Sequence, residues 1–491
     1  MKHITFLIVI FFTTSIFSQT EQEKIEATVS KSNIEGHIYF LADDLLKGRE
    51  TGTSENKIAA SYLANALRGY GVKPNPTTNN YYQKVPMQEV TPPERFTLSI
   101  DGNEYKKKVV LQTSKMDFTG TAVYMGYGLE DDYKGKDLKE KIVLVRAGGP
   151  NAKDARAAFG LREKKAELAK KAGAIGIIEF IKAAPQMWGY IDHNFNSKRL
   201  EIAETVNQAS KTDAFAYVWV QDENGAYADA LSNKNEMPIK MMMEGENRVK
   251  VTSQNVVGMV EGTDPTLKNE YIIYSAHYDH VGIGQPDESG DTIYNGARDN
   301  AVGVTTVLSM AENLAKYPTK RSALFILFTG EEKGLLGSEY YVDNPIVPLD
   351  QMVYCFNSDN GGYNDTSVAT IVGLTRTTAQ QNIENAVSTF GLRAIDDPAP
   401  EQGLFNRSDN VHFAKKGIPS PTFSLGFTNF SDSTKHYHRP SDEADTLDYD
   451  YLLKFFRAYV LSGRNIANDP STPFWVKGDA YEEAGKKLYN K

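Results

Sequence analysis

Two uninterrupted apolar runs in the second half of the chain restrict its fold more than any other feature. Residues 271–276 and 322–328 are apolar at nearly every position, which is typical of strands buried on both faces of a sheet. Between them, residues 300–315 repeat apolar side chains at the spacing of an amphipathic helix. This order predicts an α/β fold with a mostly parallel central sheet that is flanked by helices on both faces.

Length and local pattern add a second, smaller domain to this sheet. At roughly 150 residues per domain, a chain of 491 residues suggests two or three domains. Short strand-like runs such as residues 141–146 alternate with turns, and a charged helix over 161–171 precedes another apolar strand. We therefore expect a smaller β-rich α/β domain over 101–250. It is inserted into a discontinuous main domain that comprises residues 19–100 and 251–491.

The N-terminal segment has the layout of a secretory signal peptide. Lys2 precedes an apolar run over residues 6–12, and Thr and Ser residues lead to an exit near Ser18. The run is too short for a transmembrane helix. We expect a signal peptide over residues 1–18, a periplasmic or secreted protein, and no stable membrane anchor. Its removal takes away only Lys2, so the net charge changes from −9 to −10.

Charge and cysteine content exclude two classes of function. The net charge of −9 argues against a partner that is a nucleic acid, because such binding needs a basic surface. A single cysteine, Cys355, excludes a disulfide framework and a cysteine-ligated zinc site. Any metal site must therefore use His, Asp and Glu. No sequence feature indicates the number of subunits.

Five segments rich in His, Asp or Glu lie where the predicted strands and turns end. They are Ser275–His280, Asn295–Gly303, Thr329–Gly334, Asn357–Gly362 and Lys435–Pro440. In a largely parallel sheet, ligands gather at the carboxyl ends of the strands. Four of the eight histidines fall within the first and last of these segments.

Each residue taken alone also has an ordinary structural interpretation. His277 could be a core histidine, and Asp299 could cap the helix that follows it. Glu331 and Glu332 could be surface carboxylates, and Asp359 could be a turn residue. His436 and His438 could be exposed loop histidines. Together, however, two imidazoles and several carboxylates can supply the ligands of a dinuclear zinc centre and leave one carboxylate as a base. The residues alone thus predict a hydrolytic metal site.

The order of these motifs resembles that of a known enzyme family. Residues 30–95 and 251–460 resemble the co-catalytic zinc peptidases that include bacterial leucyl-type aminopeptidases and glutamate carboxypeptidase II. Residues 119–180 resemble the protease-associated domain that is inserted in many members, and the Gly48-Arg49 turn resembles the family's lead-in. The resemblance implies the zinc exopeptidase fold, two Zn²⁺ ions per chain and a peptide substrate.

The resemblance also implies a role for individual residues. By it, the metal ligands are His277, Asp299 as the bridging carboxylate, Glu332, Asp359 and His438. Glu331 is the general base, and Asp279 orients His277. Tyr437 matches a position that in some relatives stabilises the oxyanion. Spacing alone leaves His280 and His436 as competing ligands, and only the family pattern decides against them.

The chain departs from the family pattern near the predicted site. Arg298 stands where an acidic residue often precedes the bridging carboxylate, and its charge could weaken metal binding or attract a substrate carboxylate. The segment Arg407-Ser408-Asp409-Asn410 resembles the family's Ser-Asp-His segment. We expect Arg407, Ser408 and Asp409 to line the substrate pocket, although Ser408 or Asp409 could instead cap a helix.

These features predict a secreted metalloexopeptidase that hydrolyses N-terminal residues from peptides. A glutamate-carboxypeptidase-like or dipeptidase activity is an alternative, because Arg298 and Arg407 could bind a substrate carboxylate. A glutaminyl cyclase would use one zinc ion, and a receptor-like protein would have lost ligands. The complete set of ligands argues against both.

Overall fold

The chain forms two compact units. The computed structural model describes residues 19–112, 116–203, 215–245 and 247–490, and the predicted signal peptide lies outside them. One unit, here called the main unit, ends at Val85 and resumes at Ser253, and the other, the inserted unit, spans Pro86–Thr252. Within the described ranges, no helix combines the length and the apolar character needed to cross a membrane.

The main unit is built on a sheet whose central strands are the apolar runs. Its strands, in spatial order, are β19 (Arg393–Ile395), β18 (Val368–Val372), β20 (Thr422–Leu425), β17 (Met352–Ser358), β13 (Tyr271–His277), β16 (Ser322–Phe328), β12 (Asn247–Val260) and β2 (Tyr82–Thr91). β20, β17, β13 and β16 are parallel to one another. β12 and β18 run antiparallel to β16 and β20. The predicted parallel sheet is therefore confirmed at its centre, whereas its flanks are mixed.

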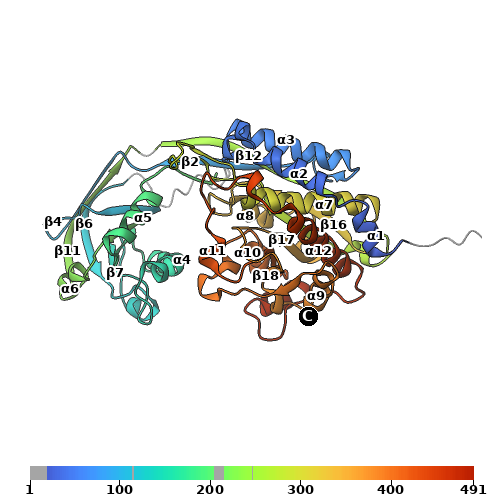
Figure 1. Cartoon of the computed structure of the whole chain (residues 1–491). Coiled ribbons are helices and arrows are strands. Elements are labelled where there is room, and N and C mark those ends of the chain that lie inside the picture. Colours follow the sequence, from blue (N-terminus) through green and yellow to red (C-terminus); the bar gives the residue numbers. More distant parts are fainter. Residues whose placement is uncertain (1–18, 113–115, 204–214, 246, 491) are drawn as a thin grey trace, which may run out of the picture. The chain divides into compact units, whose positions relative to one another are not determined.

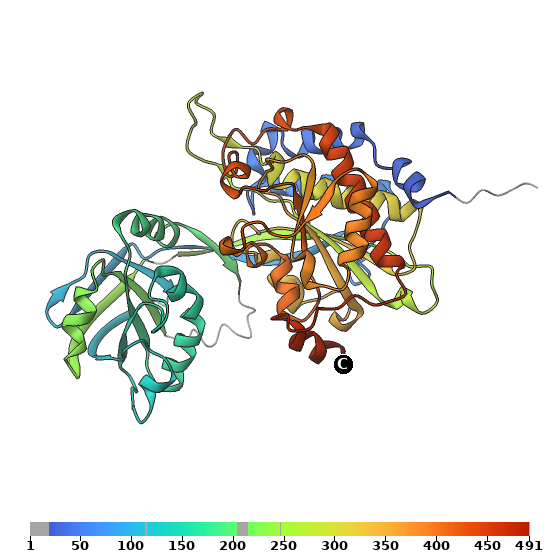
Figure 2. The ribbon, with the colours of Figure 1, turned by 60° about the horizontal axis from the view of Figure 1, so that its bottom comes forward.

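Helices cover both faces of this sheet, because successive side chains of a strand point to opposite sides. Tyr274 and Phe325 belong to a core with helices α1 (Glu21–Glu26), α2 (Lys31–Leu41), α3 (Ser54–Gly69), α7 (Gly303–Lys316), α9 (Gln380–Thr389) and α12 (Tyr449–Asn468). Ile273 and Ile326 face the other side, with α8 (Leu336–Asp343), α10 (Asn410–Lys415) and α13 (Glu482–Tyr489). Figures 1 and 2 show this α/β arrangement. Short elements complete the unit: β1 (Lys73–Pro74), β14 (Gly282–Ile283), β15 (Ile293–Tyr294) and α11 (Phe430–Ser433).

The inserted unit has a sheet of its own. The strands follow the order β4 (Asn103–Glu104), β3 (Arg95–Ile100), β11 (Glu236–Glu244), β6 (Met116–Tyr124), β7 (Ile142–Arg146), β8 (Gly176–Ile181), β10 (Ala216–Gln221) and β5 (Lys108–Gln112). β6, β7, β8 and β10 are parallel. Helices α4 (Ala155–Lys171) and α5 (Pro185–Phe195) contribute to the core on one face, and α6 (Ala226–Ser232) to the core on the other. β9 (Arg199–Ile202) pairs with residues 87–90 of β2.

The boundary of the inserted unit differs from the one that the sequence suggests. The sequence places residues 95–100 in the main domain, but β3 pairs along its length with β11 of the inserted sheet. The unit accordingly begins at Pro86 rather than at residue 101. The partner of β3 lies about 140 residues further along the chain, so no local pattern reveals the pairing.

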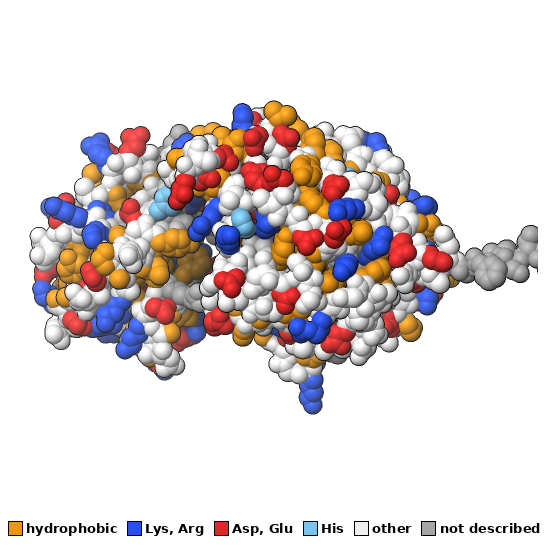
Figure 3. Space-filling view, in the orientation of Figure 1, with side chains coloured by type: hydrophobic (Ala, Val, Ile, Leu, Met, Phe, Trp, Pro, Cys, Tyr) orange, Lys and Arg blue, Asp and Glu red, His pale blue; other side chains and the backbone are white. Residues whose placement is uncertain are grey.

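Charged side chains are mixed on the surface. On the face shown in Figure 3, acidic and basic side chains of the described residues are interspersed rather than separated into large areas of one sign. No large area of a single sign is therefore seen among the described residues on this face (Figure 3).

Candidate metal centre

Three neighbouring parallel strands bring the predicted site residues to one edge of the main sheet. β13 ends at His277, and β17 ends at Ser358, directly before Asp359. β16 ends at Phe328, and the loop that follows it carries Glu331 and Glu332. Because these strands are parallel neighbours, their carboxyl ends lie together, as expected for a ligand site in such a sheet.

Asp299 lies at the middle of the cluster and faces two histidines with its two oxygens. Its Oδ1 is 3.2 Å from His277 Nε2, and its Oδ2 is 3.2 Å from His438 Nε2. At the start of the next helix, Gly303 N donates to Asn300 Oδ1 at 3.0 Å, not to Asp299. The Asp299 carboxylate is therefore not used as a helix cap and is free to bridge two positions.

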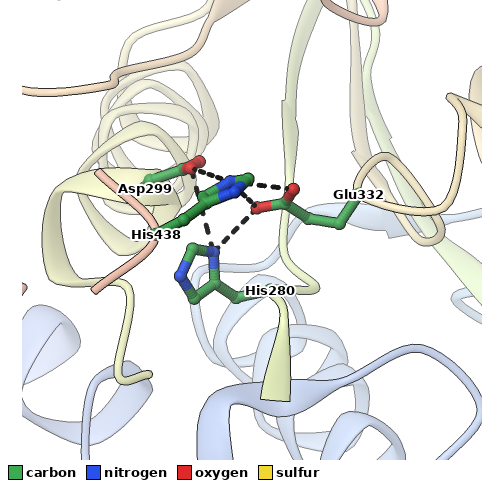
Figure 4. Close-up of side chains that lie close together, drawn as sticks. All are labelled: His280, Asp299, Glu332 and His438. Carbon is green, nitrogen blue, oxygen red and sulfur yellow. Dashed lines mark hydrogen bonds and ion pairs between the residues drawn. The ribbon is translucent and has the colours of Figure 1, made fainter. Parts of the chain in front are cut away.

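The two histidines each have a second carboxylate partner. His277 Nε2 lies 3.3 Å from Asp359 Oδ1. His438 Nε2 lies 3.1 Å from Glu332 Oε2. Figure 4 shows Asp299, Glu332 and His438 converging from different segments of the chain. The five residues that the family resemblance implies as ligands are thus brought together, with Asp299 between two pairs.

His280 lies in the same cluster, although the family pattern excludes it. Its Nδ1 is 2.8 Å from Glu332 Oε1 and 3.9 Å from Asp299 Oδ2, and Figure 4 shows its ring pointing toward these carboxylates. Its Nε2 is buried and has no hydrogen-bond partner among the described atoms. His436, the other competing residue, instead contacts Ser441 Oγ at 3.0 Å.

Burial and neighbouring carboxylates set the protonation of Glu331. Burial raises the pKa of this carboxyl well above its usual value, and the negative charges of Asp359 and Glu332 raise the pKa further. The nearby positive charge of His277 opposes the rise but does not cancel it. Glu331 is therefore a carboxyl group with a strong affinity for a proton, which suits a general base.

The other members of the cluster depend on one another for their charge. Burial alone would lower the pKa of His277, but the carboxylates of Glu331 and Asp359 outweigh burial and raise it. Burial would raise the pKa of Asp299, but hydrogen bonds from His277 and His438 hold it well below the usual range. The histidines thus supply the hydrogen bonds and the positive charge that offset these carboxylates.

This donor set fits divalent metal ions. Two groups of side chains place possible ligand atoms within 4.8 Å of one another: His280, Asp299, Glu332 and His438, and His277, Glu331 and Asp359. Within the described chain, none of these carboxylates forms an ion pair with Lys or Arg. Buried imidazole nitrogens and carboxylate oxygens without other cations are the ligands that zinc uses in cysteine-free sites.

Asp279 connects the histidine loop to the two glutamates. It is fully buried, and its carboxylate accepts from Thr51 Oγ1 at 2.8 Å and from the backbone N–H groups of Glu331 and Glu332 at 3.2 and 3.3 Å. Its Oδ1 is 4.0 Å from His277 Nδ1. Asp279 therefore holds the loop that carries Glu331 and Glu332 next to His277.

Arg49 is a positioning residue to which the sequence gives no role. Its buried guanidinium donates to the carbonyl oxygens of Leu41, Tyr278, Asn295 and Gly296 at 2.5 to 3.1 Å. It therefore ties the N-terminal segment to the loops that carry His280 and Asp299. The sequence signal for this role is the Gly48-Arg49 turn. Gly48 has a φ of +69°, and a side chain at this position would meet Tyr294 O and Gly282 O, so the turn requires glycine.

Arg298 does not face the cluster, in contrast to the sequence-based expectation. Its Nη1 donates to Asp442 Oδ1 at 3.0 Å and to Thr446 Oγ1 at 2.8 Å, and its Nη2 donates to Thr446 O. Its guanidinium also lies 5.5 Å from the centroid of the Tyr363 ring. With its donors used in this way, Arg298 is a structural residue rather than a cation for metals or substrate.

A pocket opens directly beside Asp359. Arg407, Ser408 and Tyr437 line it together with Asp359. The predicted pocket residues Arg407 and Ser408 therefore do lie next to the cluster.

Asp409 lies behind this pocket rather than in its lining. Its carboxylate is fully buried, neither oxygen has a partner among the described atoms, and burial raises its pKa to about 7. It precedes α10 but makes no capping hydrogen bond. The expectation that Asp409 lines the pocket is therefore not met, and the alternative of a side-chain cap is not met either.

Comparisons with known proteins give one consistent result. Residues 255–461 match the model of peptidase family M28. Aminopeptidase YwaD of Bacillus subtilis (strain 168) is 26% identical over 417 residues, which cover 82% of this chain and 78% of YwaD. A probable leucine aminopeptidase 2 of Aspergillus oryzae is 23% identical over 409 residues, which cover 77% of this chain and 73% of that protein.

A solved structure has the same fold. The aminopeptidase from Aneurinibacillus sp. strain AM-1 superposes with a TM-score of 0.59 at 23% identity, covering 92% of this chain and 97% of that one. The matched family region contains all five segments that form the cluster.

Proposed function

We propose, on the premise that this chain belongs to peptidase family M28, that it is a secreted zinc aminopeptidase. The observation that carries the proposal is the position of Asp299, whose two oxygens face His277 on one side and His438 on the other. We assign His277 and Asp359 to one zinc ion and His438 and Glu332 to a second, with Asp299 shared. This is the full ligand set of a two-metal hydrolase.

The protein's own groups have separate tasks in peptide hydrolysis. When bound, the zinc ions supply Lewis acidity, which polarises the scissile carbonyl and lowers the pKa of water. Glu331 takes the proton from the attacking water and passes it to the nitrogen of the leaving amine. Its position close to His277 and Asp359 supports this role. Asp279 keeps the Glu331 loop in place through its backbone N–H contacts.

Tyr437 is suited to stabilise the charge that develops on the carbonyl oxygen. Its ring stacks on His438 with centroids 3.9 Å apart, and its hydroxyl has no hydrogen-bond partner in the described chain. Burial and the carboxylates around it raise the pKa of Tyr437, so the hydroxyl stays protonated and can donate.

The carboxypeptidase alternative loses one of its supports. That alternative relied on Arg298 and Arg407 as cations for a substrate carboxylate, and Arg298 is already paired with Asp442 and Thr446. Arg407 alone remains at the pocket. We therefore favour an aminopeptidase over a carboxypeptidase.

Two further assignments belong to this proposal. Residues 1–18 act as a signal peptide that directs the chain to the periplasm or the medium. The inserted unit is a protease-associated domain, which the parallel order β6-β7-β8-β10 and the family resemblance support.

The test uses one neutral peptide with a free or an acetylated N-terminus, with and without a chelator. We expect release of the N-terminal residue from the free peptide only, and loss of that release with the chelator. In Glu331→Gln, kcat should fall by about 10²–10⁴, while the zinc content measured by elemental analysis stays at two per chain. Glu312→Gln, a half-buried carboxyl on α7 bonded to Asn33, is the matched control.

Two results would count against the proposal. Cleavage of the acetylated peptide would favour the carboxypeptidase alternative. A Glu331→Gln variant with two zinc ions and normal kcat would show that another group is the base.

A further inference from the structure

The lining of the pocket beside the candidate metal centre is chemically mixed. It includes four apolar side chains, Val372, Leu404, Phe427 and Phe430. It also includes Arg407, Ser408 and Thr422, the three polar residues on which the argument depends. A pocket for a purely aliphatic side chain would have no use for a guanidinium and two hydroxyl groups without acceptors.

The hydroxyl groups of Ser408 and Thr422 are set up as donors. Asn357 Nδ2 donates to Ser408 Oγ at 2.9 Å and to Thr422 Oγ1 at 3.2 Å, while Asn357 Oδ1 accepts from Ser275 Oγ at 2.8 Å. Each hydroxyl thus receives a hydrogen bond from the protein, and its own hydrogen has no acceptor among the described residues. A hydroxyl in this state is free to donate to a ligand.

The other serine and threonine hydroxyls of the pocket are already engaged. Ser433 Oγ donates to Phe430 O at 2.8 Å, Thr434 Oγ1 donates to Phe430 O at 3.0 Å, and Ser424 Oγ donates to Asp359 O. This contrast separates Ser408 and Thr422 from the other serines and threonines of the lining. Both are nearly buried, so bulk water is a poor substitute for a ligand acceptor.

Arg407 adds a positive charge to the lining of the same pocket. Its guanidinium forms no ion pair or side-chain hydrogen bond within the described chain, and it is exposed at the pocket. The other charged residue of the lining is Asp359, which faces His277. A guanidinium without a partner and two hydroxyl donors together match a carboxylate, which accepts several hydrogen bonds and carries a negative charge.

We propose that this pocket receives the side chain of the substrate's N-terminal residue and selects glutamate or aspartate through Arg407, Ser408 and Thr422. The inference rests on the proposed aminopeptidase function, because the pocket adjoins Asp359 and Tyr437 on one side of the metal centre. A scissile carbonyl held there brings the side chain of the same N-terminal residue to the pocket. The apolar lining residues would contact the methylene groups of that side chain.

The experiment compares peptides that are identical except for an N-terminal Glu, Gln, Leu or Lys. For the zinc-loaded wild-type enzyme, we expect kcat/KM for Glu to exceed that for its isostere Gln by about tenfold, because a charge-assisted hydrogen bond is lost in Gln. In Arg407→Gln the Glu-to-Gln ratio should fall close to one. In Arg407→Glu the preference should move from Glu to Lys, which a folding defect cannot produce.

Arg393→Gln is the matched control, since it removes an exposed cation of the main unit that does not line the pocket. It should keep the wild-type Glu-to-Gln ratio. A wild-type preference for Leu, or ratios that stay the same in both Arg407 variants, would overturn the inference and leave the aminopeptidase proposal intact. A glutamate preference found only at the second residue of the peptide would also overturn it. If zinc-loaded enzyme cleaves none of the peptides, the proposed function itself fails.

Discussion

A buried ion pair of the inserted unit and the candidate metal centre of the main unit handle buried charge in opposite ways. In the inserted unit, Lys165 and Glu179 are both fully buried, and their N–O distance is 2.5 Å. The Glu179 carboxylate also accepts from Gly148 N, Tyr217 OH and Trp219 Nε1 at 2.8 to 3.1 Å. One negative charge thus meets one positive charge, and the carboxylate oxygens have protein donors.

The metal centre of the main unit shows no such balance. Its acids outnumber its histidines, and within the described part of the chain no Lys or Arg forms an ion pair with them. Burial makes uncompensated charge expensive, so a surplus of acids favours the binding of an added cation. The comparison teaches that a buried charge supplied with protein partners is structural, whereas a buried surplus of one sign indicates a ligand.

Adding metal provides the strongest test of this difference. We expect zinc to stabilise the main unit by about 4 kcal/mol at a free concentration one thousand times the Kd, because the ions bind the folded state. The inserted unit should not respond. Hydrogen exchange followed by mass spectrometry distinguishes the two, since β13 and β16 report on one unit and β7 and β8 on the other.

Asp299→Asn is the variant that accompanies this measurement. It removes the carboxylate that faces both histidines, so activity and the zinc-dependent protection of β13 should be lost. Equal protection of both units by zinc in the wild-type protein would contradict the comparison. The same would hold for an Asp299→Asn variant that binds two ions with unchanged affinity.

Breaking the balanced pair should have the next largest effect. In Lys165→Met, Glu179 stays buried without its cation, and breaking a buried pair by removing one partner typically costs about 3–5 kcal/mol of unfolding free energy. Denaturant unfolding measures this loss, and zinc content should not change. Lys171→Met, an exposed lysine in the last turn of the same helix, is the control. A small loss in Lys165→Met would mean that the pair is not a structural element of the inserted unit.

His37 represents a third way of handling a buried ionisable group, namely keeping it uncharged. Its Nδ1 and Nε2 each lie 2.7 Å from a tyrosine hydroxyl, of Tyr62 and Tyr70, and burial lowers its pKa to about 4. The unfolded chain protonates near pH 6.5, so the stabilisation is complete above that pH. It is lost as the pH falls from 6.5 to 4, by up to about 3 kcal/mol.

The variant His37→Gln isolates this contribution. Because the variant cannot titrate at this position, the difference in unfolding free energy between wild type and variant should shrink as the pH falls from 6.5 to 4. Measuring the difference removes the effect of His412, whose pKa burial also lowers to about 4. A difference that is the same at pH 7 and pH 4 would show that His37 is not buried in its neutral form.

The sequence predicts the centre of the main sheet and the site because both follow from strand order. The uninterrupted apolar pattern of residues 271–276 and 322–328 predicts two strands that are buried on both faces of a sheet. Once these strands are parallel neighbours, their carboxyl ends lie at the same edge of the sheet. His277 and the Glu331-Glu332 pair follow from that placement. The ligand roles within the cluster come from the family resemblance.

What the sequence misses depends on contacts between distant segments. Arg298 and Asp299 are adjacent, yet Arg298 turns to Asp442, which lies about 140 residues further along the chain, while Asp299 faces the histidines. The assignment of β3 to the inserted sheet depends in the same way on β11. His280 joins the cluster only because the loop after β13 bends toward Glu332. Spacing along the chain carries no information on any of these directions.

The smallest expected effect concerns the double variant Lys165→Met with Glu179→Gln. Removing both charges leaves no uncompensated ion, and Gln keeps an acceptor for the donors of Tyr217 and Trp219. We expect its unfolding free energy to lie within about 1 kcal/mol of wild type, because replacing a whole buried pair is often nearly neutral. Denaturant unfolding of the wild type, the two single variants and the double variant gives the four unfolding free energies of a double-mutant cycle. A double variant that is less stable than Lys165→Met would mean that the charges themselves hold the inserted unit together.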